Sequence, residues 1–128
     1  MDIIKFYSAK EKEGYNLFAI ILDNKILVKE YIDTIDQKNK TQLAALLKRI
    51  LCKGPPKDKK RFRNLGDDIY ELKTRNGARV LCFFGGTLLE RSLVLTHGID
   101  KPTGKILRRE KRKAVSFRKD FFKDAVII

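Results

Sequence analysis

Cysteine, histidine and tryptophan are scarce in this sequence, and their scarcity argues against several kinds of site. The chain has two cysteines, one histidine and no tryptophan. Cys52 and Cys82 lie within apolar runs and outside any paired motif, which favours two buried thiols in a reduced protein over a disulfide. The sequence shows no metal-ligand spacing, no glycine-rich phosphate loop and no Ser/His/Asp set. We therefore expect no metal and no cofactor, and metal-dependent cleavage and nucleotide hydrolysis are disfavoured.

Long apolar runs are also missing. The segment MDIIKFYSAK has no apolar run long enough for a signal peptide, and no run of about 18 apolar residues occurs elsewhere. The sequence therefore predicts a soluble, cytoplasmic protein without a membrane partner. A length of 128 residues is most simply one domain, residues 1–128, because domains usually span about 100–150 residues.

Basic residues, by contrast, are abundant. The 29 Lys and Arg exceed the 16 Asp and Glu and give a formal net charge of +13. The excess lies in residues 53–79, with nine basic and four acidic side chains, and in residues 101–128, with ten and three. If these segments meet in space, they form a basic surface suited to a polyanion. The alternative is a solvated basic face without a partner, but a small protein with this charge favours nucleic-acid contact.

The apolar periodicity predicts an α+β fold. Strands are expected at residues 3–7 and 15–22, as a hairpin, and at residues 69–74, 78–84 and 88–96, as a three-stranded meander around the turn at Asn76-Gly77. Helices are expected at residues 26–36 and 41–52, and a basic helix from Thr103 onward. The result is a small antiparallel sheet, an N-terminal strand or hairpin plus the meander, packed against two N-terminal helices and followed by a basic C-terminal helix.

Local details of these elements are also predicted. Thr41 is expected to cap the second helix, whose core stripe comprises Leu43, Leu46, Leu47, Ile50 and Leu51. Residues 57–68 are expected to form a basic loop. Period-two alternation places His97 at the end of the last strand, on the face of Leu93 and Leu95. Glu71 could pair with Lys73 or Arg79 and be purely structural.

The single histidine lies close in sequence to several fixed cations, which is a suitable set for acting on a phosphodiester. RNA carries its own nucleophile, the 2′-OH, so cleavage requires a proton acceptor, a proton donor and cations for the phosphate. His97 has an unperturbed pKa near 6.5, and arginines offer forked donors to phosphate oxygens. The candidate catalytic residues are His97, Arg79, Arg75 and Lys101, and the candidate RNA-binding residues are Lys57, Lys59, Lys60, Arg61, Arg63, Lys73, Lys105, Arg108 and Arg109.

Three ordered segments between residues 25 and 120 resemble the HigB-like, phage-derived branch of the RelE–ParE toxin superfamily. IYELKTRNGARVLCFF is similar to that branch's "LYELR…YRVFYF" strand pair, LVLTHGIDKPTGK to its "LLHGFxKKTxKTP" segment, and REKRKAVSFRKD to its "EIxxA…R" helix. Ile99 stands where the branch has phenylalanine, and Pro102 replaces one of two paired lysines. These departures bear more on the catalytic assignment than on the fold.

The resemblance implies a toxin of a type II toxin–antitoxin system. Its activity would be ribosome-associated endoribonucleolytic cleavage of mRNA by 2′-OH transesterification, which inhibits translation. The implied partners are mRNA, the ribosome and a cognate antitoxin with a helix-turn-helix domain. A second hypothesis is a non-catalytic member of the same fold that binds RNA or a protein, as the gyrase-directed branch does, or a phage-derived member that has lost activity.

Overall fold

The computed structural model describes residues 1–128. Its secondary structure follows the chain in this order: β1 (Asp2–Tyr7), β2 (Asn16–Leu22), β3 (Lys25–Ile26), α1 (Leu27–Thr34), α2 (Gln37–Lys53), β4 (Phe62–Gly66), β5 (Ile69–Lys73), β6 (Ala78–Phe84), β7 (Ser92–Asp100), α3 (Gly104–Asp124) and β8 (Val126–Ile127). The α+β class, the N-terminal hairpin and the β5–β6 hairpin are confirmed.

All eight strands belong to one mixed sheet, in the order β4-β5-β6-β7-β2-β1-β8, with β3 paired to β2. The pairs β2–β7 and β1–β8 are parallel, and the other pairs are antiparallel. The prediction of a small antiparallel sheet is therefore wrong. Hairpins join strands that are neighbours in sequence, whereas the β2–β7 pair joins segments separated by two helices and four strands, which periodicity does not reveal.

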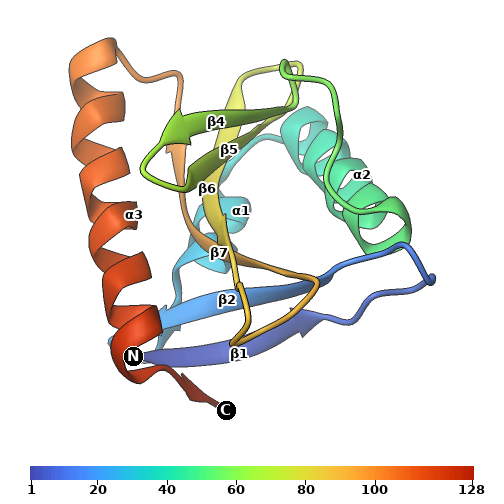
Figure 1. Ribbon diagram of the computed structural model, residues 1–128. Coiled ribbons are helices and arrows are strands. Elements are labelled where there is room, and N and C mark those ends of the chain that lie inside the picture. Colours follow the sequence, from blue (N-terminus) through green and yellow to red (C-terminus); the bar gives the residue numbers. More distant parts are fainter.

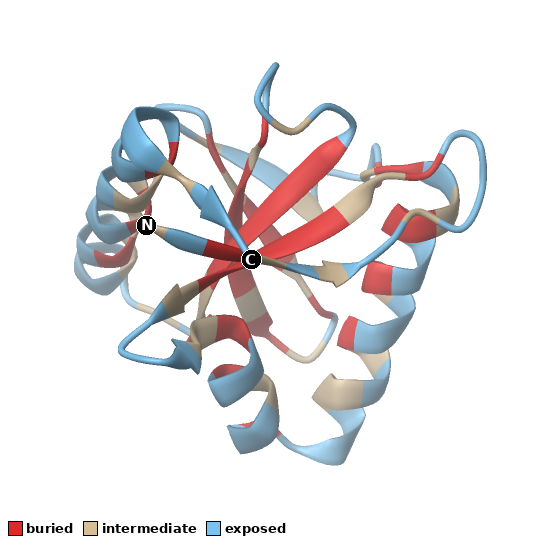
Figure 2. Cartoon of the chain, turned by 90° about the horizontal axis from the view of Figure 1, so that it is seen from below, coloured by how far each residue is buried: buried red, intermediate tan, exposed pale blue.

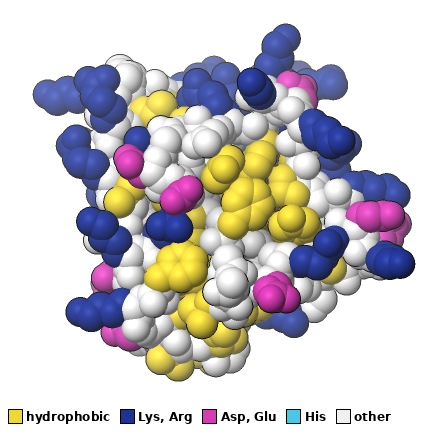
Figure 3. Space-filling model, viewed as in Figure 1, with side chains coloured by type: hydrophobic (Ala, Val, Ile, Leu, Met, Phe, Trp, Pro, Cys, Tyr) yellow, Lys and Arg dark blue, Asp and Glu magenta, His cyan; other side chains and the backbone are white.

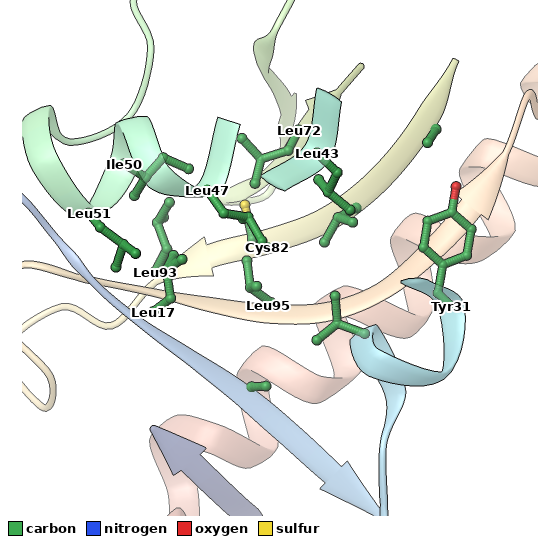
Figure 4. Close-up of a cluster of buried hydrophobic side chains, with 14 of the residues drawn as sticks. Leu17, Tyr31, Leu43, Leu47, Ile50, Leu51, Leu72, Cys82, Leu93 and Leu95 are labelled. Carbon is green, nitrogen blue, oxygen red and sulfur yellow. The ribbon is translucent and has the colours of Figure 1, made fainter. Parts of the chain in front are cut away.

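Helices cover both faces of this sheet, with α1 and α2 on one side and α3 on the other (Figure 1). The first core lies beneath α1 and α2, where Leu43, Leu47 and Leu51 point toward Leu93 and Leu95 of β7 (Figure 4). The second core packs α3 against the opposite face, and the buried strands lie between exposed outer helix surfaces (Figure 2). The sequence predicted packing of the sheet against the two N-terminal helices, and the structure shows that the basic helix α3 also packs on it as a structural layer.

Helix α2 begins earlier than the sequence predicts. Its N-cap is Asp36, whose carboxylate accepts a hydrogen bond from the Asn39 N–H at 2.8 Å. Thr41 lies inside the helix and donates to the Gln37 carbonyl, so the predicted Thr41 cap is wrong. Asp is as good an N-cap as Thr, and it precedes the first residue of the helix. Leu46 is only half-buried and does not belong to the first core.

The expected basic loop at residues 57–68 contains strand β4, which pairs antiparallel with β5. Phe62 stacks on Tyr70 with ring centroids 4.8 Å apart. Asp67 and Asp68 both have positive φ and form the turn to β5. Because β4 is an edge strand, Arg63 and Asn64 within it are exposed, and these polar residues obscured the strand.

The last predicted strand, 88–96, is displaced to β7 (Ser92–Asp100). Residues 88–91 belong to the turn after β6, where Leu88 is exposed and Arg91 has positive φ. Strand β7 continues past His97 through Gly98, where only glycine fits, because a Cβ there would lie 1.9 Å from the Tyr31 ring. The glycine of the His-Gly pair is thus a packing requirement for α1.

A bulge in β7 reverses the orientation of His97. Val80 pairs with Gly98 and Cys82 with Leu95, so Leu81 alone faces both Thr96 and His97. The extra residue breaks the alternation, and His97 turns toward α3 instead of sharing the face of Leu93 and Leu95. The predicted face of His97 is therefore wrong, because a single inserted residue flips every side chain that follows it.

Candidate nucleic-acid interface

The basic residues of the β5–β6 hairpin gather around two adjoining hollows. One, of about 520 Å³, is lined by Lys73, Arg75, Arg79 and Lys101, with Asp36 as its only acid. The other, of about 300 Å³, shares Lys73 and Arg75 with the first and adds Lys59, Lys60, Arg61 and Arg63 around Glu71. We call these eight basic residues and their two hollows the cationic groove. Segments from residues 59–63, 73–79 and 101 thus form one surface.

Most of this charge is not neutralised by the protein. Only Arg63 and Arg79 form ion pairs, and the other six cations of the groove have no acidic partner within the chain. The groove contains no hydrophobic residue. In Figure 3, Lys and Arg side chains gather along the edge of the molecule near the start of α3 and the loop that leads into β4. Such a surface suits a polyanion.

Glu71 holds two arginines of the groove. Its carboxylate lies 3.3 Å from Arg63 Nη2 on β4 and 3.3 Å from Arg79 Nε on β6. Glu71 is 1% exposed, whereas the Arg79 side chain is 16% exposed and also donates to the Gly77 carbonyl at 3.2 Å. The predicted pairing of Glu71 with Arg79 is confirmed. A buried carboxylate is stable only when it is paired with cations. The two ion pairs therefore orient both guanidinium groups.

The hairpin turn is attached to α2 by side-chain hydrogen bonds. The Asn76 N–H donates to Gln42 Oε1 at 3.0 Å, and the Thr74 hydroxyl donates to Asn39 Oδ1 at 2.6 Å. Helix α2 therefore holds the turn that carries Arg75. Arg75 itself is exposed and has no ion-pair partner, so its guanidinium faces solvent from a fixed backbone.

Tyr31 connects α1 to the strand ends that carry Arg79 and Lys101. Its hydroxyl accepts a hydrogen bond from the Arg79 N–H at 3.2 Å and donates to Asp100 Oδ1 at 2.8 Å. Burial and the bond to Asp100 raise the pKa of Tyr31 above its ordinary value of 10.0, so the hydroxyl remains a donor at neutral pH. Sequence reasoning missed this role, because Tyr31 reads as one more apolar residue of an amphipathic helix.

His97 lies outside the cationic groove, between β7 and α3. Its Nδ1 is 3.0 Å from Thr96 Oγ1, its Nε2 is 3.4 Å from Glu110 Oε2, and Phe117 covers the ring edge-on. The His97 side chain is 14% exposed. Burial lowers the pKa of His97 below 6.5, although Glu110 opposes this shift. His97 is therefore neutral at pH 7, with both ring nitrogens directed at the protein.

Glu110 is the acidic partner of His97 on α3. Burial acts to raise its pKa, but the hydrogen bond from Lys113 and the nearby positive charges outweigh burial and lower the pKa of Glu110 below 4.5. Lys113 Nζ lies 3.1 Å from Glu110 Oε2. The carboxylate is therefore ionised at neutral pH, and its main partner is Lys113 and not the neutral imidazole.

The remaining predicted RNA-binding residues are separate from the groove. Lys105, Arg108 and Arg109 are exposed on α3, where Arg109 lies 3.8 Å from Glu110, and Lys57 is exposed after the end of α2. No cluster of His, Cys, Asp and Glu could hold a metal ion. None of the helices has both the length and the hydrophobicity needed to cross a membrane.

A family model described as "Phage derived protein Gp49-like (DUF891)" matches residues 30–119. No curated protein matches the chain significantly. The matched segment runs from α1 into α3 and includes the hairpin, Glu71, His97 and every residue of the cationic groove.

Proposed function

The chain belongs to the Gp49-like family of phage-derived proteins, a RelE-like toxin family, and from this premise we propose that it is the toxin of a type II toxin–antitoxin system. Its proposed activity is metal-independent cleavage of mRNA on the ribosome, which inhibits translation. The proposed partners are mRNA, the ribosome and a cognate antitoxin with a helix-turn-helix domain. HigB-like proteins are the branch of the superfamily whose motifs the sequence resembles.

The cationic groove is the observation that carries this proposal. Six cations without acidic partners surround two arginines that Glu71 orients, and the groove lies beside an ordered hairpin turn. Single-stranded RNA brings closely spaced phosphates to such a surface. In transesterification the 2′-OH loses its proton and attacks phosphorus, and the leaving 5′-oxygen gains a proton. Arg79 and Arg75 would stabilise the charge that develops on the nonbridging oxygens, and Lys101 would hold a phosphate.

His97 is proposed to transfer the proton in this reaction, and a conformational step is part of that proposal. Because Nε2 faces Glu110, the imidazole must turn away from α3 to reach RNA bound in the groove. Its neutral form at pH 7 is the correct state for a general base. General acid–base catalysis contributes roughly 10²–10⁴-fold to such reactions.

Primer extension on a reporter message tests the activity. Expression of the wild type should arrest translation and cut mRNA on ribosomes, leaving 2′,3′-cyclic phosphate ends. Arg79→Ala and His97→Ala should relieve the arrest in a protein that stays folded and binds its antitoxin. Arg79→Lys should rescue activity only partly, because a lysine lacks the forked donors. Lys59→Ala should change little, since one phosphate contact among many is a small share of binding. Undiminished cleavage in both alanine variants would refute the site assignment.

The non-catalytic hypothesis keeps one specific observation in its favour. Both ring nitrogens of the only histidine face protein groups, as they would if His97 served only to attach α3 to the sheet. A protein of this kind would bind RNA or a protein target through the same cationic groove. Growth arrest without any cleaved message in wild-type cells would select this function over the endoribonuclease.

A further inference from the structure

A second concave surface lies on the side of the molecule formed by α1 and α2. Between these helices and the end of β1 is a groove of about 390 Å³. Its lining includes Phe6 and Tyr7 of β1, Ile32 of α1, and Leu43 and Leu47 of α2. Tyr7 is 50% exposed, so apolar surface faces solvent here. We call this surface the α1–α2 groove.

Charge surrounds this apolar surface. Four lysines line the α1–α2 groove, against a single acid, Asp33: Lys10, Lys29, Lys40 and Lys48. None of the four forms an ion pair within the chain. Ammonium groups beside an apolar surface are complementary to carboxylates that flank apolar side chains.

The two grooves differ in a way that identifies the class of partner. Seven of the twelve residues that line the α1–α2 groove are hydrophobic, whereas the cationic groove has none. Nucleic acid suits the cationic groove and not the α1–α2 groove, because a phosphate backbone makes no favourable contact with apolar side chains. An apolar channel between two helices accepts a third helix, which places a row of apolar side chains between them. The lysines then select acidic flanks on that helix.

We propose that the α1–α2 groove is the docking site for an acidic amphipathic helix of a partner protein. Under the proposed function this partner is the antitoxin, and the identity of the partner, though not the existence of the site, rests on that function. The two grooves share no lining residue. A helix bound in the α1–α2 groove therefore leaves the cationic groove uncovered, and the two ligands bind independently.

The probe is a short synthetic helical peptide with a stripe of leucines flanked on both sides by glutamates. One control peptide has lysines in place of the glutamates, and another has serines in place of the leucines. Fluorescence anisotropy with the full chain should give at least about tenfold tighter binding of the acidic peptide than of either control, because both charge and apolar contact contribute. Equal affinities for the three peptides would overturn the proposal.

Two neighbouring alanines of α2 supply matched variants. Ala44 lines the α1–α2 groove, whereas Ala45 lines a different hollow on the other side of the helix, and both are exposed. Ala44→Arg should weaken binding of the acidic peptide about tenfold by filling the groove, and Ala45→Arg should leave it within about twofold. Equal effects of the two substitutions would overturn the site.

Charge reversal gives a second test that does not depend on filling the groove. The double variant Lys40→Glu, Lys48→Glu should bind the acidic peptide more weakly and the lysine control peptide more tightly than the wild type does. Unchanged selectivity between the two peptides would overturn the role of these lysines. Neither Ala44→Arg nor the charge reversal should reduce RNA cleavage, since these residues lie outside the cationic groove. Peptide binding without any RNA cleavage by the wild type would refute the proposed activity and leave the docking site supported.

Discussion

Glu71 is the single residue on which the geometry of the cationic groove most depends. It lies on the central strand of three, and its carboxylate reaches Arg63 on β4 and Arg79 on β6. One buried negative charge thus fixes two guanidinium groups that would otherwise repel each other. The negative charge of Glu71 repels RNA, whereas its ion pairs hold the arginines in place for cleavage. RNA binding and RNA cleavage should therefore respond in opposite directions when this charge is removed.

Glu71→Gln should tighten RNA binding and slow cleavage. Removing a negative charge from the groove favours a polyanion, whereas an unheld Arg79 no longer meets the phosphate in a fixed geometry, which should reduce the cleavage rate by roughly tenfold or more. Binding is measured by anisotropy with a short single-stranded RNA, and cleavage by single-turnover kinetics with that RNA on ribosomes.

Asp36→Asn is the matched control for this prediction. Asp36 is the other acid of the groove, and it forms no ion pair with any groove arginine. Asparagine preserves the N-cap of α2. This variant should also tighten RNA binding but keep its cleavage rate. If Glu71→Gln and Asp36→Asn behave alike in both assays, Glu71 acts only through its charge.

His97 should make the stability of the protein depend on pH just below neutrality. Burial lowers its pKa in the folded state relative to about 6.5 in the unfolded chain, so the unfolded state binds more protons as the pH falls. The free energy of unfolding should therefore decrease between about pH 7 and about pH 5.5, before carboxylates begin to titrate. Urea unfolding at both pH values measures this change.

His97→Gln removes the titrating group and keeps a polar side chain between Thr96 and Glu110. Its unfolding free energy should vary less over this range than that of the wild type. The stabilising effect of the lowered pKa of Glu110 is lost only as the pH falls below 4.5, so it does not interfere. An identical pH dependence in the two proteins would mean that His97 is not the group responsible.

At the scale of elements, α2 performs two tasks with two faces. Its inner face carries Leu43, Leu47 and Leu51 into the first core, and its N-terminal turns hold the hairpin through Asn39 and Gln42. The position of Arg75 therefore depends on the packing of this helix. Loss of core contact beneath α2 should weaken the fold and loosen the hairpin together.

Leu47→Ala should lower the free energy of unfolding by roughly 2–5 kcal/mol, the usual range for truncating a buried leucine. Leu47 is 6% exposed and belongs to the first core. Leu46→Ala is the control, because its side chain is half-buried and lines an open hollow with Arg49, and it should cost clearly less. Chemical denaturation measures both values. A loss below about 0.5 kcal/mol for Leu47→Ala would show that this face of α2 is not packed.

At the scale of the whole molecule, the cationic groove and the α1–α2 groove have different proposed ligands. The net charge of +13 acts over the whole surface, and unpaired cations line both grooves, six in the cationic groove and four around the apolar α1–α2 groove. Antitoxin association should therefore be faster at low salt, because an acidic partner is steered toward the protein. The proposed antitoxin has three candidate positions on this protein, which are the basic surfaces of residues 53–63 and 101–119 and, for its helix, the α1–α2 groove.

RNA binding should depend steeply on salt. If the six unpaired cations of the groove all contact phosphates, affinity should fall roughly 10³-fold between about 50 and about 200 mM salt. Replacing both Lys73 and Arg75 by alanine should make the dependence shallower, whereas Lys119→Ala on the exposed side of α3 should not change it. Titrations at several salt concentrations measure the slopes. Equal slopes for all three proteins would place the RNA elsewhere.

The features that the sequence determined by itself are those that depend on local patterns. The β5–β6 hairpin followed from the Asn76-Gly77 turn, α2 from its leucine stripe, and the basic surface from the charge of residues 53–79. Each depends on residues close together in the chain, where periodicity and turn chemistry act directly. Arg75, Arg79 and Lys101 line one hollow because they flank neighbouring strand ends, and their proposed catalytic role stays a prediction.

Only the tertiary structure decided how the remaining parts meet. The parallel β2–β7 pair makes the sheet mixed and lets α3 cover its second face. One extra residue in β7 turns His97 toward Glu110, and the pairing of β4 with β5 places Arg63 beside Glu71. These outcomes depend on the register between strands and on contacts between residues remote in sequence. The alternation of apolar and polar residues does not reveal the position of a β-bulge. The surroundings of His97 were therefore decided by strand pairing in the sheet and not by the sequence around it.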